Sequence, residues 1–319
     1  MSSGNDDFRL DKELLPIMLD QRVRNAARPP LTTIDPITMR ARAAAEFVPW
    51  NDTPQQLDRV TDFAIDAVTH KVHVRLYEPR TNDYGGALVY FHGGGWVIGD
   101  LDLEDGALRI IAKQSGLKVL SVDYRLAPEH RFPAALEDGE TVMNWLTANG
   151  KSLGIDANRI AFGGGSAGAN VALGTALRLR DNAGSMPKYM ALLYGAFSRG
   201  QDYPSYQEFG DGRFGLPSAA MNFFWNSYLG DIKDHPHAIP IYANLRGLPD
   251  CYILETELDV LASESGDMVS KMRAAGLEVN HQIYKGAMHG FTQYFKSSGL
   301  ARKALNEIAE VLASKIGEK

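Results

Sequence analysis

The sequence is poor in cysteine, because Cys251 is the only one among 319 residues. An intrachain disulfide is therefore excluded, and since Cys251 opens an apolar run we expect a small buried side chain there rather than a nucleophile. No stretch approaches the ~20 apolar residues that a transmembrane helix needs, and residues 1–12 lack the apolar segment of a signal peptide. These absences favour a cytoplasmic protein without a membrane span.

Clustered positive charge is missing as well. The formal net charge is −6 and no long block of Lys and Arg occurs, so nothing favours binding to nucleic acid or to an anionic membrane surface. With 45% hydrophobic residues the chain can bury a large core, and its length suits one large α/β domain or two modest ones. We expect a globular protein without a nucleic-acid partner, and a homodimer is left open.

From Gly86 onward, near-continuous apolar runs alternate with helical segments, which is typical of a parallel sheet covered on both faces. The expected strands are 87–91, 119–123, 159–162, 189–194, 252–255 and 279–284. Residues 60–67 and 71–77 precede them and alternate in the manner of an antiparallel hairpin at a sheet edge. One helix is predicted to start at Pro133, and the last carries the apolar stripe Leu305, Ile308, Leu312 and Ile316.

Two regions fall outside this alternation. Residues up to Trp50 are predicted to form helices separated by a Pro-rich break. The helix before the break carries an apolar stripe: Leu14, Leu15, Met18, Leu19 and Val23. The helix after the break is predicted to start at Asp35-Pro36. More than fifty residues separate Phe197 from Tyr252, which predicts an inserted helical element rather than a structureless loop. Its many aromatic residues suit either an apolar lid over a pocket or ordinary core packing.

The chemistry starts from the run Gly164-Gly165-Ser166-Ala167-Gly168, which lies between an expected strand and an expected helix. A serine at such a sharp turn projects its hydroxyl away from the backbone, and the helix start offers N–H groups and partial positive charge to an oxyanion. Ser166 is therefore a candidate nucleophile. Gly163, Gly165 and Gly168 also fit a dinucleotide fingerprint, but the next strand ends without an acidic residue and the motif lies mid-chain, which disfavours nucleotide binding.

A nucleophilic serine needs a base and an acid that orients it, and in an open α/β sheet these groups lie beyond the carboxyl ends of the strands. Asp250 precedes its strand and so lies at the wrong end. Asp259 follows the strand 252–255 at the right end, with Glu257 as the main rival. We favour Asp259 as the acid.

Among the histidines, His289 follows the strand 279–284 and lies on a loop at the same edge. His281 falls within that strand, in alternation with apolar residues, and is interpreted as a core histidine. The chain order Ser166, Asp259, His289 is the order found in the nucleophile-elbow enzymes, which indicates that His289 is the base.

The run His92-Gly93-Gly94-Gly95-Trp96 directly follows the strand 87–91. Successive glycines allow backbone N–H groups to point into a site with no side chain in the way, so this loop is the expected source of oxyanion donors. His92 precedes the serine in sequence and is interpreted as a residue that shapes the loop rather than as the base.

With these motifs and the stretch from Val122 to Asp138, the chain resembles the hormone-sensitive-lipase family, the bacterial group IV carboxylesterases. The resemblance implies an α/β-hydrolase fold: a mostly parallel central sheet, helices on both faces and a helical cap. It also implies Ser166 as nucleophile, His289 as general base and then acid, and Asp259 as the acid that orients His289. The implied oxyanion hole consists of the backbone N–H groups of Gly94, Gly95 and Ala167.

The resemblance further implies a serine esterase that cleaves small-molecule carboxylic esters of short to medium acyl chain, without cofactor or metal. The expected organisation is an N-terminal cap segment at 1–55, hydrolase core at 56–200 and 238–319, and a cap insertion at 201–237. An amidase or lactonase on the same triad is the alternative, and a ligand-binding receptor on the same scaffold is a further one. A receptor would be expected to lose a triad member, and all three are present.

The chain departs from the family pattern at two places. Gly165 stands directly before the serine, where the family usually has Asp or Thr. The acid motif, usually D-P-L-x-D-E, reads Asp259-Val260-Leu261-Ala262-Ser263-Glu264. Both changes remove a carboxylate near the site without removing a triad member, so we expect them to affect substrate preference more than the reaction.

Overall fold

The structure, a computed structural model, describes residues 6–30, 33–51, 54–80 and 85–317. Residues 1–5, 31–32 and 52–53 of the expected N-terminal segment lie outside this description, as do 81–84 and 318–319 of the expected core.

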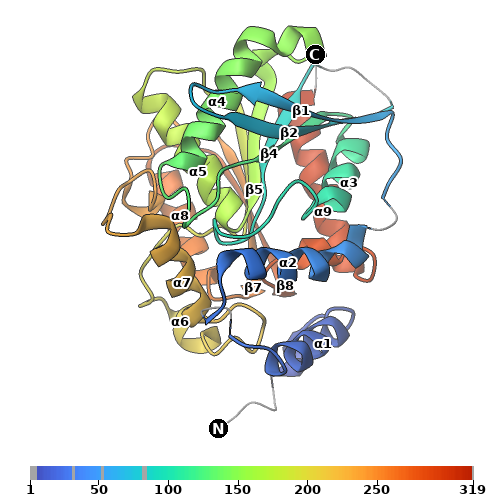
Figure 1. Ribbon diagram of the computed structural model, residues 1–319, viewed down its shortest axis with the longest axis vertical. Coiled ribbons are helices and arrows are strands. Elements are labelled where there is room, and N and C mark those ends of the chain that lie inside the picture. The colour runs from blue at the N-terminus through green and yellow to red at the C-terminus, as the bar shows by residue number, and fades with distance from the viewer. Residues whose placement is uncertain (1–5, 31–32, 52–53, 81–84, 318–319) are drawn as a thin grey trace.

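A mixed sheet forms the centre of the molecule (Figure 1). In the described residues it has eight strands in the order β1-β2-β4-β3-β5-β6-β7-β8. Their bounds are Arg59–Asp66, Lys71–Glu78, Ala87–Phe91, Lys118–Asp123, Ile160–Gly165, Tyr189–Leu193, Cys251–Leu258 and Val279–Met288 for β1 to β8. The β1–β2 and β2–β4 pairs are antiparallel and the others parallel, which confirms the predicted edge hairpin and the predicted parallel core.

Helices cover both faces of the sheet, as predicted. In Figure 1, α4, α5 and α8 lie on one side of the strands and α3 and α9 on the other, while α1, α2, α6 and α7 gather beyond one end. The bounds are Leu15–Ala26, Pro36–Asn51, Asp105–Ser115, Ala134–Asn149, Ala167–Asp181, Pro204–Phe209, Ser218–Leu229, Ala262–Ala274 and Gly299–Leu312 for α1 to α9. No helix of the described ranges is both long and apolar enough to cross a membrane.

Three strands run further towards their carboxyl ends than the apolar pattern predicts. β5 continues through three glycines to Gly165, because these residues pair in parallel register with Ala191 to Leu193 of β6 despite their low strand propensity. β7 reaches Leu258 and β8 reaches Met288. Consequently Ser166, Asp259 and His289 each directly follow the last residue of a strand, at one edge of the sheet.

The N-terminal helices only partly follow the expected pattern. The side chain of Asp35 accepts a hydrogen bond from the backbone N–H of Thr38 at 3.0 Å, which confirms the predicted start of α2. Of the expected apolar stripe, Leu14 and Met18 are buried, but Leu19 and Val23 are 43% and 71% exposed. The buried stripe is therefore narrower than predicted.

The insertion after Phe197 is helical, as predicted, and consists of α6, α7 and connecting loops. Part of its aromatic content is ordinary packing: Trp96 contacts Trp225 and Tyr228 with ring centroids 4.3 and 4.6 Å apart. Phe214 and Phe224, in contrast, line a cavity. The aromatic residues of the insertion therefore divide between core packing and cavity lining.

Candidate active site

Ser166 occupies the turn between β5 and α5 with φ 57° and ψ −120°, a region that non-glycine residues rarely adopt. Its backbone N–H donates to the carbonyl of Leu193 at 2.9 Å, which holds the turn against the neighbouring strand. A Cβ at Gly168 would lie 1.9 Å from the carbonyl oxygen of Phe91, so only glycine lets the first turn of α5 approach β3 this closely. The serine hydroxyl is thereby presented at the end of the sheet.

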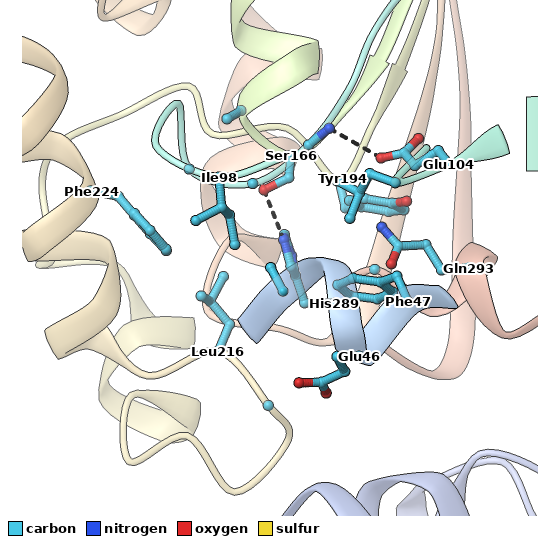
Figure 2. Close-up of a pocket in the computed structure, with 18 of the residues that line it drawn as sticks. Glu46, Phe47, Ile98, Glu104, Ser166, Tyr194, Leu216, Phe224, His289 and Gln293 are labelled. Carbon is cyan, nitrogen blue, oxygen red and sulfur yellow. Dashed lines mark hydrogen bonds between the residues drawn. The ribbon is translucent and has the colours of Figure 1, made fainter. Parts of the chain in front are cut away.

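The structure brings together the three side chains that the sequence singled out. The Nε2 atom of His289 lies 2.8 Å from the Oγ atom of Ser166 (Figure 2). The Nδ1 atom of the same ring lies 2.6 Å from Oδ2 of Asp259. A buried carboxylate at Nδ1 favours the tautomer with the proton on that nitrogen, which leaves Nε2 free to accept the serine proton.

Further donors hold the carboxylate of Asp259, which is only 2% exposed. The hydroxyl of Thr256 donates to Oδ2 at 2.6 Å, and the backbone N–H of Leu261 donates to Oδ1 at 3.0 Å. These bonds fix the orientation of the carboxylate and offset part of the cost of burying its charge.

The structure separates the rival candidates from this site. Glu257 accepts a hydrogen bond from the backbone N–H of Gly286 at 2.8 Å and has no bond to His289 in the described chain. His281 pairs with Glu255 through its Nε2 atom at 2.9 Å, as suits a satisfied histidine, although its side chain is half-buried rather than fully so. Cys251 is buried, as predicted, and burial raises the pKa of its thiol to about 12, which disfavours the thiolate that a nucleophile needs.

The glycine loop after β3 leaves unpaired amides beside Ser166. The backbone N–H groups of Gly94, Gly95 and Ala167 donate to no other described residue. Gly94 and Gly95 have φ values of 109° and 60°, and a Cβ at Gly95 would lie 2.3 Å from the ring of Phe224. Residues other than glycine are therefore excluded at these two positions, both by the backbone conformation and by the lack of space for a Cβ atom.

His92 shapes this loop. Its ring stacks on Tyr124 with centroids 4.3 Å apart, its Nδ1 atom lies 2.7 Å from the carbonyl oxygen of Gly93, and its own carbonyl accepts a bond from the Tyr124 hydroxyl at 2.8 Å. Complete burial lowers the pKa of His92 to about 4, so the ring is neutral at pH 7.

The buried imidazole predicts a pH dependence of stability. The unfolded chain takes up a proton near the ordinary pKa of 6.5, whereas folded His92 resists protonation down to about pH 4. The unfolding free energy should therefore fall as the pH drops from 6.5 to 4, by roughly 1.4 kcal/mol per pH unit from this group. His92→Asn keeps a donor for the Gly93 carbonyl and should show a shallower loss in urea unfolding between pH 4.5 and 7. An unchanged slope would contradict the assignment.

Three polar residues of the site were missed by sequence reasoning. Glu104, Tyr194 and Gln293 line the cavity beside Ser166 and His289. Glu104 lies at the start of α3, where an acidic residue reads as an ordinary helix-start residue, and Tyr194 ends an apolar strand. No local pattern distinguishes either from a structural residue.

Tyr194 packs against Gly165, the position before the serine at which the chain departs from the family pattern. Its ring packs edge-on against His289 with centroids 5.2 Å apart, and its hydroxyl is 2.6 Å from Oγ1 of Thr292. A Cβ at Gly165 would lie 3.1 Å from the Tyr194 ring and hydroxyl, so the Asp or Thr usual in the family would require Tyr194 to shift by a few tenths of an ångström.

A cavity of about 230 Å³ leads from Ser166 towards α2 and the insertion (Figure 2). Its apolar lining comes mainly from these two regions: Met39, Phe47, Phe214, Leu216, Met221 and Phe224. Gln21, Asn25, Arg42 and Glu46 line it on the side of the N-terminal helices. This volume is below the ~300–1,000 Å³ of pockets that hold drug-sized ligands, so the space suits a small molecule.

A serine on a strand-to-helix elbow, with a histidine and a carboxylate from later strands of a mostly parallel sheet, defines a hydrolase of the α/β type. The chain belongs to the family described as alpha/beta hydrolase fold, whose model matches residues 88–293. This membership and the described sheet confirm the predicted fold class.

Named relatives and solved structures agree with this family. The chain is 36% identical over 255 residues to Esterase LipI of Mycobacterium tuberculosis, covering 78% of this chain and 79% of the relative. It is 30% identical to an acetyl esterase of Salmonella dublin, covering 84% and 83%. A hyperthermophilic esterase from the archaeon Pyrobaculum calidifontis superposes with a TM-score of 0.90 at 31% identity, covering 96% of this chain and 98% of the other. These esterases accord with the predicted resemblance to the hormone-sensitive-lipase family.

Proposed function

We propose that this chain, a carboxylic ester hydrolase, cleaves esters of short to medium acyl chain through an acyl-enzyme formed on Ser166. The observation that carries the proposal is the hydrogen-bonded line from the Ser166 hydroxyl through His289 to the buried Asp259. A hydroxyl paired in this way with a neutral imidazole is the arrangement that activates a serine for acyl transfer.

The reaction proceeds in two halves. Ser166 Oγ attacks the ester carbonyl carbon while His289 Nε2 takes the serine proton, and Asp259 stabilises the imidazolium that forms. The N–H groups of Gly94, Gly95 and Ala167 bind the developing oxyanion, and one such donor is typically worth ~10²–10³ in kcat. The alcohol leaves with the proton from His289. A water molecule, deprotonated by the same nitrogen, then releases the carboxylic acid and restores Ser166.

Residues 1–55 and 201–237 form the proposed cap over a core of residues 56–200 and 238–319. Contacts between the two cap segments support this division: Arg9 pairs with Glu208, and the guanidinium of Arg22 donates to the carbonyl oxygen of Arg213 at 2.7 and 3.0 Å. Because both segments also supply apolar lining to the cavity, the cap limits the length of the acyl chain that fits.

A fluorophosphonate probe tests the nucleophile and the reaction class together. Peptide mass spectrometry should find the adduct on Ser166, and rates on matched ester, amide and lactone substrates should be highest for the ester. Failure of the probe to label Ser166 would instead favour a ligand-binding role. A faster reaction on the amide or the lactone would reassign the substrate class on the same triad.

Shortening Phe224 should shift the acyl-chain preference. Its side chain lies against Gly95 and lines the cavity, so Phe224→Ala opens space next to the scissile bond. Each additional buried CH₂ contributes ~0.8 kcal/mol, or about fourfold in kcat/KM, so the ratio of octanoate to butyrate hydrolysis should rise by roughly that factor per accommodated CH₂. The measurement is kcat/KM over a series of p-nitrophenyl esters.

Phe223→Ala is the matched control, because this neighbouring phenylalanine on α7 is half-buried and does not line the cavity. Its chain-length profile should equal that of the unaltered protein. Equal profiles for both variants would show that the cavity next to Phe224 does not hold the acyl chain.

A further inference from the structure

A buried carboxylate lies against the glycine loop, and the proposed reaction does not use it. Glu104 is 5% exposed, and its Oε1 atom accepts a hydrogen bond from the backbone N–H of Gly93 at 3.1 Å, one of the dashed lines in Figure 2. Its Oε2 atom accepts from the hydroxyl of Tyr90. Burying a carboxyl group is costly unless donors satisfy it, so these partners make the position specific.

The hydrogen-bond partners of Glu104 lie on β3 and on the loop that follows it. Tyr90 belongs to β3, and Gly93 is the second residue of the glycine loop. Glu104 itself lies at the start of α3, and Gln293, from the short 3₁₀ helix Phe291–Tyr294, lines the same cavity. Glu104 therefore links the loop that carries the free amides to β3 and to the start of α3.

Three carbonyl groups of the loop are also hydrogen-bonded. The carbonyls of His92 and Gly93 bond to Tyr124 and to the ring of His92, and the carbonyl of Gly94 accepts from the backbone N–H groups of Val97 and Ile98. Without the bond to Glu104, the amide of Gly93 would have no partner in the described chain. Because glycine has the largest conformational freedom of all residues, a loop with three of them needs such anchors to keep one shape.

We propose that Glu104 is a positioning residue for ester hydrolysis, holding the amide of Gly93 so that the N–H groups of Gly94 and Gly95 stay directed at the oxyanion. The inference rests on the proposed function of this site. Glu104 acts through the loop and does not itself touch the reacting atoms. Oxyanion donors stabilise the transition state only when they are aimed before the reaction begins, so loosening the loop reduces kcat more than it weakens substrate binding.

Glu104→Ala and Glu104→Gln test this role. With active sites counted by fluorophosphonate titration, Glu104→Ala should lower kcat per active site about 10- to 100-fold, because it weakens several oxyanion bonds without removing them. KM should change by less than about threefold. The inhibition constant of a trifluoromethyl ketone, which forms a tetrahedral oxyanion on the serine, should rise in parallel with the loss of kcat.

Glu104→Gln keeps a side-chain oxygen that can accept the hydrogen bond from the backbone N–H of Gly93, so this variant should recover most of the rate. If Glu104→Ala does not fold, Glu104→Asp should show the same pattern, a lower kcat with little change in KM, but with a smaller loss of kcat.

Glu264→Ala is the matched control. Glu264 is also fully buried and accepts backbone N–H groups, those of Phe197 and Ser198, but it has no bond to the glycine loop. Its loss should lower the melting temperature and leave kcat per active site within about threefold. The inference is overturned if Glu104→Ala behaves in the same way, or if its kcat falls while inhibition by the ketone is unchanged. Full activity in the Glu104 variants beside an inactive Ser166→Ala would end this inference alone, whereas an active Ser166→Ala would end the proposed function.

Discussion

Ser166→Ala is expected to lower kcat for a p-nitrophenyl butyrate substrate by on the order of 10⁶, because the variant has no atom that can attack the carbonyl or carry the acyl group. The fold should survive. Alanine keeps the Cβ atom at this strained turn, and the side-chain interaction lost is the hydrogen bond of 2.8 Å to His289. The measurement is the rate of p-nitrophenol release at saturating substrate, together with a thermal melt followed by circular dichroism.

Ser115→Ala provides the control for this prediction. Ser115 is also buried, but its hydroxyl donates to the carbonyl of Ile111 at the end of α3, away from the cavity. This variant should retain the full rate. Hydrolysis by Ser166→Ala at more than about a thousandth of the original rate, in a preparation free of other esterases, would mean that Ser166 is not the nucleophile.

Asp259→Asn is expected to lower kcat by about 10⁴. The carboxylate of Asp259 accepts a hydrogen bond from the Nδ1–H group of His289. In the variant, an asparagine side-chain N–H facing Nδ1 would favour the opposite tautomer, with the proton on Nε2. A histidine in that form cannot accept the proton of Ser166. The asparagine has nearly the same shape, so the melting temperature should change far less than the activity, and both are measured on the same preparation.

Glu257→Gln separates the two acidic candidates at the carboxyl end of β7. Glu257 accepts the backbone N–H of Gly286, which a glutamine oxygen can also do, so this variant should keep kcat within about threefold. If Glu257→Gln lost the activity and Asp259→Asn kept it, the roles of the two residues would have to be exchanged.

The sequence was sufficient to single out Ser166, Asp259 and His289, which the structure brings within hydrogen-bond distance although no two of them are near each other in the chain. The prediction used the strand positions, the rule that sites lie beyond the carboxyl ends of parallel strands, the chain order of the three residues and the family resemblance. Asp250 was excluded by the strand-end rule alone. The prediction tolerated errors in strand length, since β5, β7 and β8 all run further than the apolar pattern indicated. When a strand runs a few residues further than predicted, the residue that follows it still lies at the carboxyl edge of the sheet and not at the opposite edge.

Residues whose role depends on neighbours far away in the chain were out of reach of the sequence. Glu104 reads as a helix-start residue, and only its contact with Gly93, eleven positions earlier, connects it to the glycine loop after β3. Leu19 and Val23 satisfy the spacing of an apolar stripe and are nevertheless exposed, because spacing specifies a helix face and not whether another element covers it.

The sequence by itself determined a mostly parallel sheet covered by helices and a serine at a glycine-flanked strand-to-helix turn, because apolar period and glycine placement are properties of neighbouring residues. The order of Ser166, Asp259 and His289 along the chain is likewise read directly from the sequence. Only the tertiary structure decided which aromatic residues pack in the core and which line the cavity, how closely Tyr194 packs against Gly165, and how large the cavity is. These features depend on distances between segments that the sequence leaves unspecified, and such distances are set when the core closes around side chains at close-packed density.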